Sequence, residues 1–403
     1  LQVASLVFGS GSTGSGSGVL SGAGSLVALV GNGFSQGSLN RLEVGGWGQG
    51  QFTVSDGATL DGRANASACV GEFHYCNNFI GNAAGSTSTF TVTGSGSSAS
   101  LLRGFVVGGL AVFHPPIDTF TFGTPGGTTR GRVEVLAGGS LTTDFGSVGV
   151  APGGGSPMGT ERSLGEVAID GAGSVWRLTG ATLDATGARL STGEHRNAVA
   201  SLSVTNGGLL LIDGKAGQQN GVGLSTGGGR TDMLISGAGS TLQYLGDAGY
   251  LNVGRSNGSA RLVVNAGGAV DNPFYVSVGR DGSFGDLVVD GVGSRLSLTG
   301  TASVAALGSA QNPVMDIGRN GTGQVTVSNG ARIELLATEA RVNGPQLSVG
   351  RDAASAGALT ISGVGSTVAL SAQSVLAGGG PGEAVNPFVR VGRDGSGPLT
   401  ING

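Results

Sequence analysis

The sequence predicts an all-β chain folded as a right-handed parallel β-helix, with about twelve coils of three short strands each. Three observations favour this fold class. Apolar and polar residues alternate in short segments, and these segments recur along the whole chain. No apolar stripe of the length of a helix has the i, i+3, i+4, i+7 spacing. Glycine makes up 83 of the 403 residues, a share that alone would suggest disorder. Because the glycines recur in register with apolar pairs, the disordered alternative is excluded.

The repeating unit is clearest between Val276 and Leu298, where the sequence reads VSVGRDGSFGDLVVDGVGSRLSL. Three short stretches with apolar residues at every second position are separated by GRDGSFG and DGVGS. These separators are rich in residues that accept positive φ or cap a turn. We therefore expect each coil to hold three strands joined by tight corners.

The first strand of each coil is expected to end in glycine. This glycine recurs twelve times at intervals of 25 to 44 residues, within the range of repeat proteins. The positions are Gly9, Gly45, Gly81, Gly108, Gly149, Gly193, Gly223 (or Gly227), Gly254, Gly279, Gly318, Gly350 and Gly392.

The second strand shows two inward columns, separated by one outward position. The first column is Phe52, Phe90, Val133, Val167, Leu202, Met233, Leu262, Leu287, Val325, Leu359 and Leu399. The second is Val54, Val92, Val135, Ile169, Val204, Ile235, Val264, Val289, Val327, Ile361 and Ile401. Such β-branched residues favour a pleated, buried surface. A third strand follows, with Val27, Trp176, Leu242, Leu296, Ile333 and Val368 pointing inward.

One such coil cannot bury its apolar face alone, so the coils are expected to stack into one continuous core. Residues 1–403 are therefore interpreted as a single domain, about 55 Å long at roughly 4.8 Å per coil. Insertions are expected at 61–77, 109–130, 152–164 and 371–386. In solenoids such insertions protrude from one edge, where a binding function can be added.

Composition excludes several classes of partner. Charged residues are 11% of the chain, the net charge is −4 and Lys215 is the single lysine. Nucleic acids and anionic membrane surfaces require clustered positive charge, so neither is expected as a partner. No apolar run approaches the length of a membrane span, so no membrane-spanning segment is expected.

The two cysteines, Cys69 and Cys76, lie in the first insertion. A disulfide that closes a small surface loop is favoured over two free thiols, and it fits an exported protein. A metal site is not expected there, because His74 is the one nearby histidine and cannot complete a ligand set.

Several motifs resemble the repeat associated with bacterial type V secretion (autotransporter) and PEP-CTERM surface proteins. They are VGRDGSG at 391–397, IGRNGTG at 317–323, LVVDGVGS at 287–294 and LTISGVGS at 359–366. The resemblance implies an exported or cell-surface bacterial protein with a β-helical body. It brings no catalytic residues and no cofactor with it.

Arginine directly follows the turn glycine in five later coils, at Arg255, Arg280, Arg319, Arg351 and Arg393, with Asp281, Asp352 and Asp394 behind three of them. Stacking would make a ladder of charge along one edge. One interpretation is a groove for an acidic polysaccharide. The favoured alternative is that the aspartates cap the corners and the arginines cover neighbouring turns. Calcium is not expected, because each turn offers a single carboxylate beside an arginine.

An enzyme is not expected. Polysaccharide lyases and hydrolases need paired carboxylates, or a metal with a base, on one face. Here Glu134 stands alone among small outward residues, and His74, His114 and His195 belong to different coils or loops. We therefore expect a structural solenoid outside the cell, with the passenger or stalk of an adhesin as the alternative and a polysaccharide-active enzyme as a minor one. Its partners would then be copies of itself, an extracellular polysaccharide or a cell surface.

The ends suggest one mode of self-assembly. Leu1 and Val3 alternate like a third strand, whereas the last coil ends after Leu399 and Ile401 without one. Subunits are expected to join head to tail, with the start of one completing the open coil of the next, and such contacts propagate into fibres. The alternative is a fragment whose remaining part caps or anchors this one.

Overall fold

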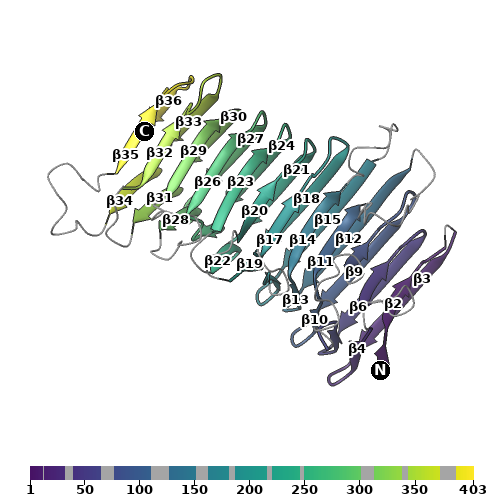
Figure 1. Cartoon of the computed structure of the whole chain (residues 1–403). Coiled ribbons are helices and arrows are strands. Elements are labelled where there is room, and N and C mark those ends of the chain that lie inside the picture. Colours follow the sequence, from purple (N-terminus) through teal and green to yellow (C-terminus); the bar gives the residue numbers. More distant parts are fainter. Residues whose placement is uncertain are drawn as a thin grey trace.

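The computed structural model describes the chain except at residues 12, 32–39, 65–76, 110–126, 151–161, 181–186, 216–219, 246–248, 301–312, 338–343 and 373–386. Its described residues form three parallel sheets of twelve strands each. Every third strand of the chain lies in the same sheet, so the polypeptide winds through the sheets in turn (Figure 1). This is the predicted right-handed parallel β-helix, and its twelve coils are confirmed.

Sheet A holds the strands that the sequence predicts as third strands. It consists of β1 (Gln2–Val3), β4 (Leu26–Leu29), β7 (Thr59–Asp61), β10 (Ser98–Ser100), β13 (Ser140–Thr143), β16 (Val175–Leu178), β19 (Leu209–Asp213), β22 (Thr241–Leu245), β25 (Ala269–Asp271), β28 (Arg295–Gly300), β31 (Arg332–Ala337) and β34 (Thr367–Ala372).

Sheet B holds the predicted first strands. It consists of β2 (Ser5–Phe8), β5 (Arg41–Val44), β8 (Asn78–Ile80), β11 (Gly104–Gly109), β14 (Phe145–Val150), β17 (Arg189–Thr192), β20 (Asn220–Leu224), β23 (Gly249–Arg255), β26 (Tyr275–Arg280), β29 (Val314–Arg319), β32 (Gln346–Val349) and β35 (Phe388–Val391).

Sheet C holds the predicted second strands. It consists of β3 (Ser15–Ser21), β6 (Gln49–Ser55), β9 (Thr87–Thr93), β12 (Thr128–Leu136), β15 (Arg162–Asp170), β18 (Ala198–Thr205), β21 (Arg230–Ser236), β24 (Ser259–Asn265), β27 (Phe284–Asp290), β30 (Thr322–Ser328), β33 (Ala356–Ser362) and β36 (Leu399–Asn402).

Coils pair in register, so identical positions stack into columns that run along the axis. In sheet C, for example, Val289 lies between Val264 and Val327. The predicted inward columns are buried along the helix and lose their cover towards the last coil, where Leu399 and Ile401 are exposed. The inward and outward register read from the sequence is therefore confirmed.

Aromatic rings fill the core of the N-terminal coils. The rings of Phe8 and Phe52 are stacked with centroids 4.8 Å apart, and the ring of Phe90 lies 5.9 Å beyond that of Phe52. Phe105 follows, 6.2 Å from Trp176. Beyond Trp176, most buried side chains are aliphatic, so the core changes from ring stacking to branched aliphatic packing along its length.

The corner between sheets B and C requires a left-handed backbone residue in each coil. Eleven of the predicted glycines hold this position with positive φ, but in the seventh coil neither Gly223 nor Gly227 does. Ser225 occupies it instead, with φ of 58°. Its N–H bonds the hydroxyl of Thr192 in the preceding coil at 3.1 Å, and its own hydroxyl donates to the Gly229 carbonyl. The prediction was wrong there because the site selects a conformation, which serine can also adopt.

The corner between sheets C and A alternates between two designs, which the sequence analysis did not anticipate. Coils are counted from the N-terminus, with β2, β3 and β4 as the first. Odd-numbered coils use a Gly-x-Gly-Ser turn, which begins at Gly22, Gly94, Gly171, Gly237, Gly291 and Gly363. Even-numbered coils use a turn that is one residue shorter. It begins with a non-glycine residue at φ between 50° and 55°, namely Asp56, Ala137, Asn206, Ala266 and Asn329.

The two designs are joined by hydrogen bonds between coils. A glycine N–H of each shorter turn donates to the serine hydroxyl of the following coil at 3.0 Å, as for Gly267 and Ser294. In the other direction, the Asp290 carboxylate accepts from the Asn329 amide of the next coil at 2.7 Å. Turns of unlike design therefore bind one another on both sides.

The predicted insertions differ from the structure at their borders. β12 begins at Thr128 and β15 at Arg162, so the last residues assigned to two insertions belong to strands. β34 likewise extends to Ala372. A connection of thirteen residues between Gly300 and Val314, 301–313, was not predicted as an insertion.

Candidate functional site

The five predicted arginines stack at the corner between sheets B and C. Arg255 is in register with Arg280, and Arg280 with Arg319. Backbone bonds from the N–H groups of Arg351 and Arg393 to the preceding coils continue the column. The structure therefore brings these residues together along one edge, as expected.

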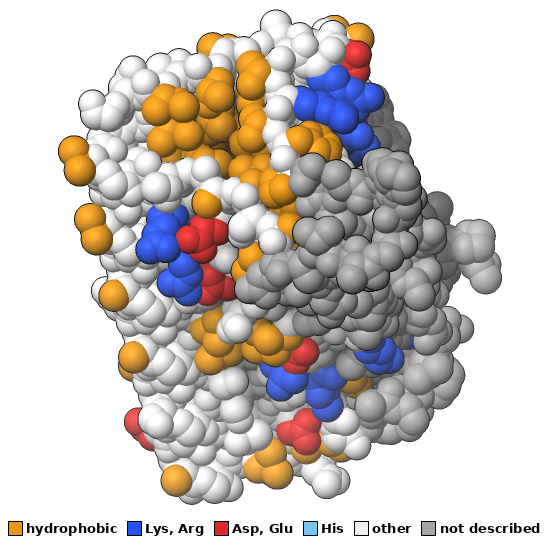
Figure 2. All heavy atoms as spheres, turned by 90° about the vertical axis from the view of Figure 1, so that its left-hand side faces the viewer, with side chains coloured by type: hydrophobic (Ala, Val, Ile, Leu, Met, Phe, Trp, Pro, Cys, Tyr) orange, Lys and Arg blue, Asp and Glu red, His pale blue; other side chains and the backbone are white. Residues whose placement is uncertain are grey.

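The charge of this column is compensated by carboxylates. Asp281 lies 3.1 Å from Arg280 and 3.6 Å from Arg255, measured from Oδ2 to Nε. Arg393 pairs with Asp394 at 3.1 Å. Viewed from the side on which the C-terminal coils lie, basic and acidic side chains lie next to one another (Figure 2). Most arginines of the column are thus in ion pairs, and exposed pairs of this kind contribute little to stability.

Serine hydroxyls cap backbone N–H groups in these turns. The Ser283 hydroxyl accepts from the Arg280 N–H at 2.8 Å, and the Ser355 hydroxyl accepts from the Asp352 N–H at 3.1 Å. Asp281 adopts φ of 54° and directs its carboxylate to arginines. Aspartate was expected to cap these turns. In both turns the cap is instead the serine that directly precedes the sheet C strand.

A buried carboxylate anchors the middle of the column. Asp316 is 1% exposed, and its Oδ2 lies 2.5 Å from Arg351 Nη1 and accepts from the Tyr275 hydroxyl at 3.2 Å. Arg319 donates to the same hydroxyl at 2.7 Å. Burial raises the pKa of Tyr275, and the Asp316 charge adds to this rise. The phenol therefore stays neutral and links two coils.

Alkaline pH is expected to destabilise the fold through three tyrosines. Burial is the main cause that raises the pKa of Tyr244 well above 10.0 and also raises those of Tyr250 and Tyr275. Their stabilising contribution is complete below the unfolded-state pKa of about 10, and it is lost above that pH because the unfolded phenols ionise first. Urea titrations across this pH range should show a falling free energy of unfolding, with a shallower fall in Tyr244→Phe. A pH-independent value would contradict the prediction.

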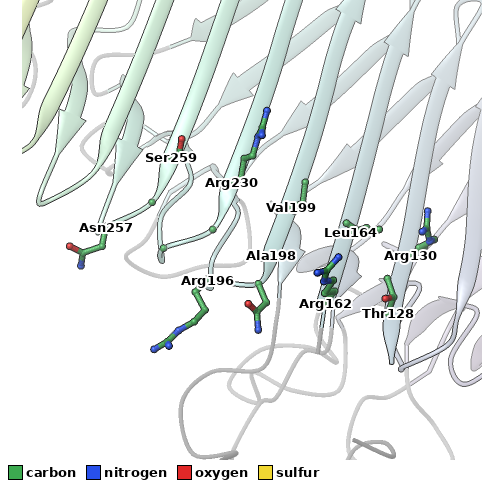
Figure 3. Close-up of a pocket in the computed structure, with 14 residues that line it drawn as sticks. Thr128, Arg130, Arg162, Leu164, Arg196, Ala198, Val199, Arg230, Asn257 and Ser259 are labelled. Atoms are coloured by element: carbon green, nitrogen blue, oxygen red, sulfur yellow. The ribbon is translucent and has the colours of Figure 1, made fainter. Parts of the chain in front are cut away.

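A second group of arginines lines a hollow of about 520 Å³ near the start of five sheet C strands. Arg130, Arg162, Arg196 and Arg230 all line it and are all exposed (Figure 3). The other lining residues are Thr128, Leu164, Asn197, Ala198, Val199, Gly228, Gly229, Asn257, Gly258 and Ser259. The hollow thus combines four cations with small polar groups and two branched aliphatic side chains.

Strand register places one of these arginines in each of four consecutive coils. Arg130 pairs with Leu164, Leu164 with Val199 and Val199 with Arg230. Arg162 and Arg196 lie at the entry to the two intermediate coils. The arginines form a staggered row along the axis, because Arg162 is in register with Thr128 and Arg196 precedes β18. Leu164 and Val199 fill the register positions between Arg130 and Arg230.

This staggered row was not predicted from the sequence. A signal was present, because the four arginines recur at intervals of 32, 34 and 34 residues (162 − 130, 196 − 162 and 230 − 196), close to one coil. These arginines lie before the inward positions of the second strand, and none directly follows the turn glycine. The position that identifies the predicted column therefore does not identify them.

Of the other predicted residues, the structure describes only some. Cys69, Cys76, His74 and His114 lie outside the described residues, so the predicted disulfide stays a prediction. Glu134 is held by Arg132 at 2.8 Å and by the Thr91 hydroxyl at 3.1 Å.

The described residues show neither a cluster of metal-ligating side chains nor a membrane-spanning helix. They contain no group of three or more histidine, cysteine or acidic side chains that could hold a metal ion. Nor does the described chain include a helix that is long and apolar enough to cross a membrane.

The chain matches no known family model and no curated protein sequence. Among solved structures it is similar to a fragment of TibA that is hyper-glycosylated by TibC. The two are 16% identical with a TM-score of 0.38, over 99% of this chain and 97% of that one. The parallel β-helix therefore rests on the strand pairing of this chain itself.

Proposed function

We propose that the chain is the non-enzymatic body of an exported bacterial surface protein and acts as a stalk that holds its loops away from the cell. The observation that carries this proposal is the continuity of the three sheets, each of which runs through twelve coils in register. A load along the axis is then shared by three parallel ladders of hydrogen bonds. The resemblance of its glycine-turn motifs to autotransporter and PEP-CTERM repeats supports the surface location.

A stalk needs length and stiffness, and the fold supplies both. Stacked coils at roughly 4.8 Å per rung span about 55 Å. Each coil contacts its neighbours, and the described residues form one apolar core that runs from Val27 to Leu359.

Two measurements test the stalk. Purified chain should appear in negative-stain electron microscopy as separate rods of about 55 Å, consistent with the rung spacing. Protease added to intact producing cells should cleave the protein, because the stalk is exposed. Compact particles without a long axis, or a pool that protease cannot reach, would contradict the proposal.

A second proposal, head-to-tail assembly, is favoured by the exposed end of the solenoid. Val389, Leu399 and Ile401 point inward in the last coil but are exposed, since no coil of the described chain lies over them. Hydrophobic side chains are visible on this side of the molecule (Figure 2). A second copy, beginning with Leu1 and Val3, would add its first strands to the three open edges. The same micrographs decide between the two, because filaments that disappear when residues 1–5 are removed would favour assembly over a single stalk.

A further inference from the structure

We propose that the arginine-lined hollow near the start of sheet C binds a linear acidic polysaccharide, a chain of uronic acid residues. The ligand would lie along the helix axis, with its carboxylates on Arg130, Arg162, Arg196 and Arg230. The hollow lies at the same corner between sheets B and C as the predicted arginine column but mainly in earlier coils, and its lining residue Asn257 is two residues after Arg255. It gives the stalk a specific ligand, and the binding does not depend on the stalk proposal.

Among the described residues, a carboxylate pairs with one of the four arginines of the hollow. Arg230 Nη2 lies 3.0 Å from Asp232 Oδ2, whereas Arg130, Arg162 and Arg196 have no carboxylate of the described residues within ion-pair distance. Arginines of the other column each have a carboxylate or phenol within reach. A row of exposed guanidinium groups repels itself, and an anionic ligand relieves that repulsion. Each guanidinium group can also bind one carboxylate through two parallel hydrogen bonds.

The spacing of the row suits a polymer of sugar acids. Four arginines in consecutive coils span about 14 Å at roughly 4.8 Å per coil. A pyranose residue in an extended chain has a rise close to one coil. Its successive carboxylates point to different sides of the chain, so they can reach arginines on both sides of the staggered row. A compact anion would contact one or two of these cations, whereas a linear polyuronate can contact all four.

The floor and rim also fit sugar rings. Leu164 and the 38% exposed Val199 present aliphatic surface between the arginines, against which the C–H face of a ring can pack. Asn197, Asn257 and Ser259 bring amide and hydroxyl groups to the rim, and these can bind sugar hydroxyls. None of the lining residues is aromatic. Single-stranded nucleic acids rely on aromatic stacking for binding, so a polyuronate is the better match.

Binding to immobilised polygalacturonate tests the proposal, with neutral dextran as the reference surface. Wild-type protein should bind polygalacturonate and not dextran, with affinity that falls as salt rises. The double variant Arg162→Gln/Arg196→Gln should lose about tenfold or more, because it removes two charge-assisted contacts. Should it melt early, the two single variants replace it, each with a smaller loss.

The matched control is Arg295→Gln/Arg332→Gln, on adjacent coils of sheet A. It makes the same change in net charge at two other exposed arginines, which pair with Asp271 and Glu334, and it should bind like the wild type. An equal loss in this control would mean that overall charge governs binding, and would overturn the site. Absence of polygalacturonate binding at low salt would overturn it too. Equal or tighter binding of oligothymidylate through the same arginines would overturn the assignment to a polyuronate.

Discussion

Val289→Asp is expected to unfold the centre of the solenoid. Val289 is fully buried between Val264 and Val327 of the neighbouring coils. A carboxylate at this position has no polar partner in the apolar column, so the loss should be about 4 kcal/mol or more. Because every coil depends on its neighbours, the coils on both sides should lose structure as well. Urea unfolding followed by circular dichroism measures the loss.

Thr326→Asp is the matched control, since Thr326 lies beside Val327 in β30 but points outward. This variant introduces the same carboxylate one coil further along, where water can solvate it, and should change the free energy of unfolding by less than about 1 kcal/mol. Similar losses in both variants would mean that the assignment of inward and outward positions is wrong.

Gly279→Ala is expected to have the second-largest effect, at the corner between sheets B and C. Gly279 has φ of +72°, and an added Cβ would lie 1.9 Å from the Thr322 carbonyl oxygen of the next coil. The methyl group therefore forces two coils apart, in addition to the cost of a left-handed alanine. Together these should remove about 3 kcal/mol, measured as a fall in the urea midpoint.

Gly85→Ala separates the two contributions. Gly85 also has positive φ, at +85°, but an added Cβ would meet no atom within 4 Å. It should cost about 1 kcal/mol, which is the backbone contribution alone. If Gly279→Ala were as mild as Gly85→Ala, contact between the coils at this corner would be looser than the structure indicates.

Those features that depend on local alternation were predictable from the sequence. The inward columns of sheet C follow from period-2 patterning, and repetition in twelve coils reveals the same pattern many times. Features that depend on backbone conformation were less accessible. Ser225 escaped detection because a left-handed φ is usually signalled by glycine, and in this coil nearby glycines offered two false candidates.

The candidate site was harder to predict because it is built across coils. Arg162 and Arg196 are 34 residues apart in the chain, and only their register in sheet C brings them to the same hollow. The predicted arginine column was easier to find, since each member follows the same turn glycine. That Asp316 compensates the charge of this column could not be predicted from the sequence. Asp316 lies within β29 and reaches Arg319 and Arg351, which belong to two different coils.

The two alternating turns between sheets C and A define the unit in which this molecule can change its length. Ser294 of one design accepts a bond from Gly267 of the other, and Asp290 accepts from Asn329 on the opposite side. Excising one coil would place two turns of the same design against each other, and neither would find its partner groups. Excising two consecutive coils restores the alternation. The module that can be duplicated, deleted or exchanged without a mismatched seam is therefore a pair of coils, and lengthened or shortened versions of this rod should differ by even numbers of rungs.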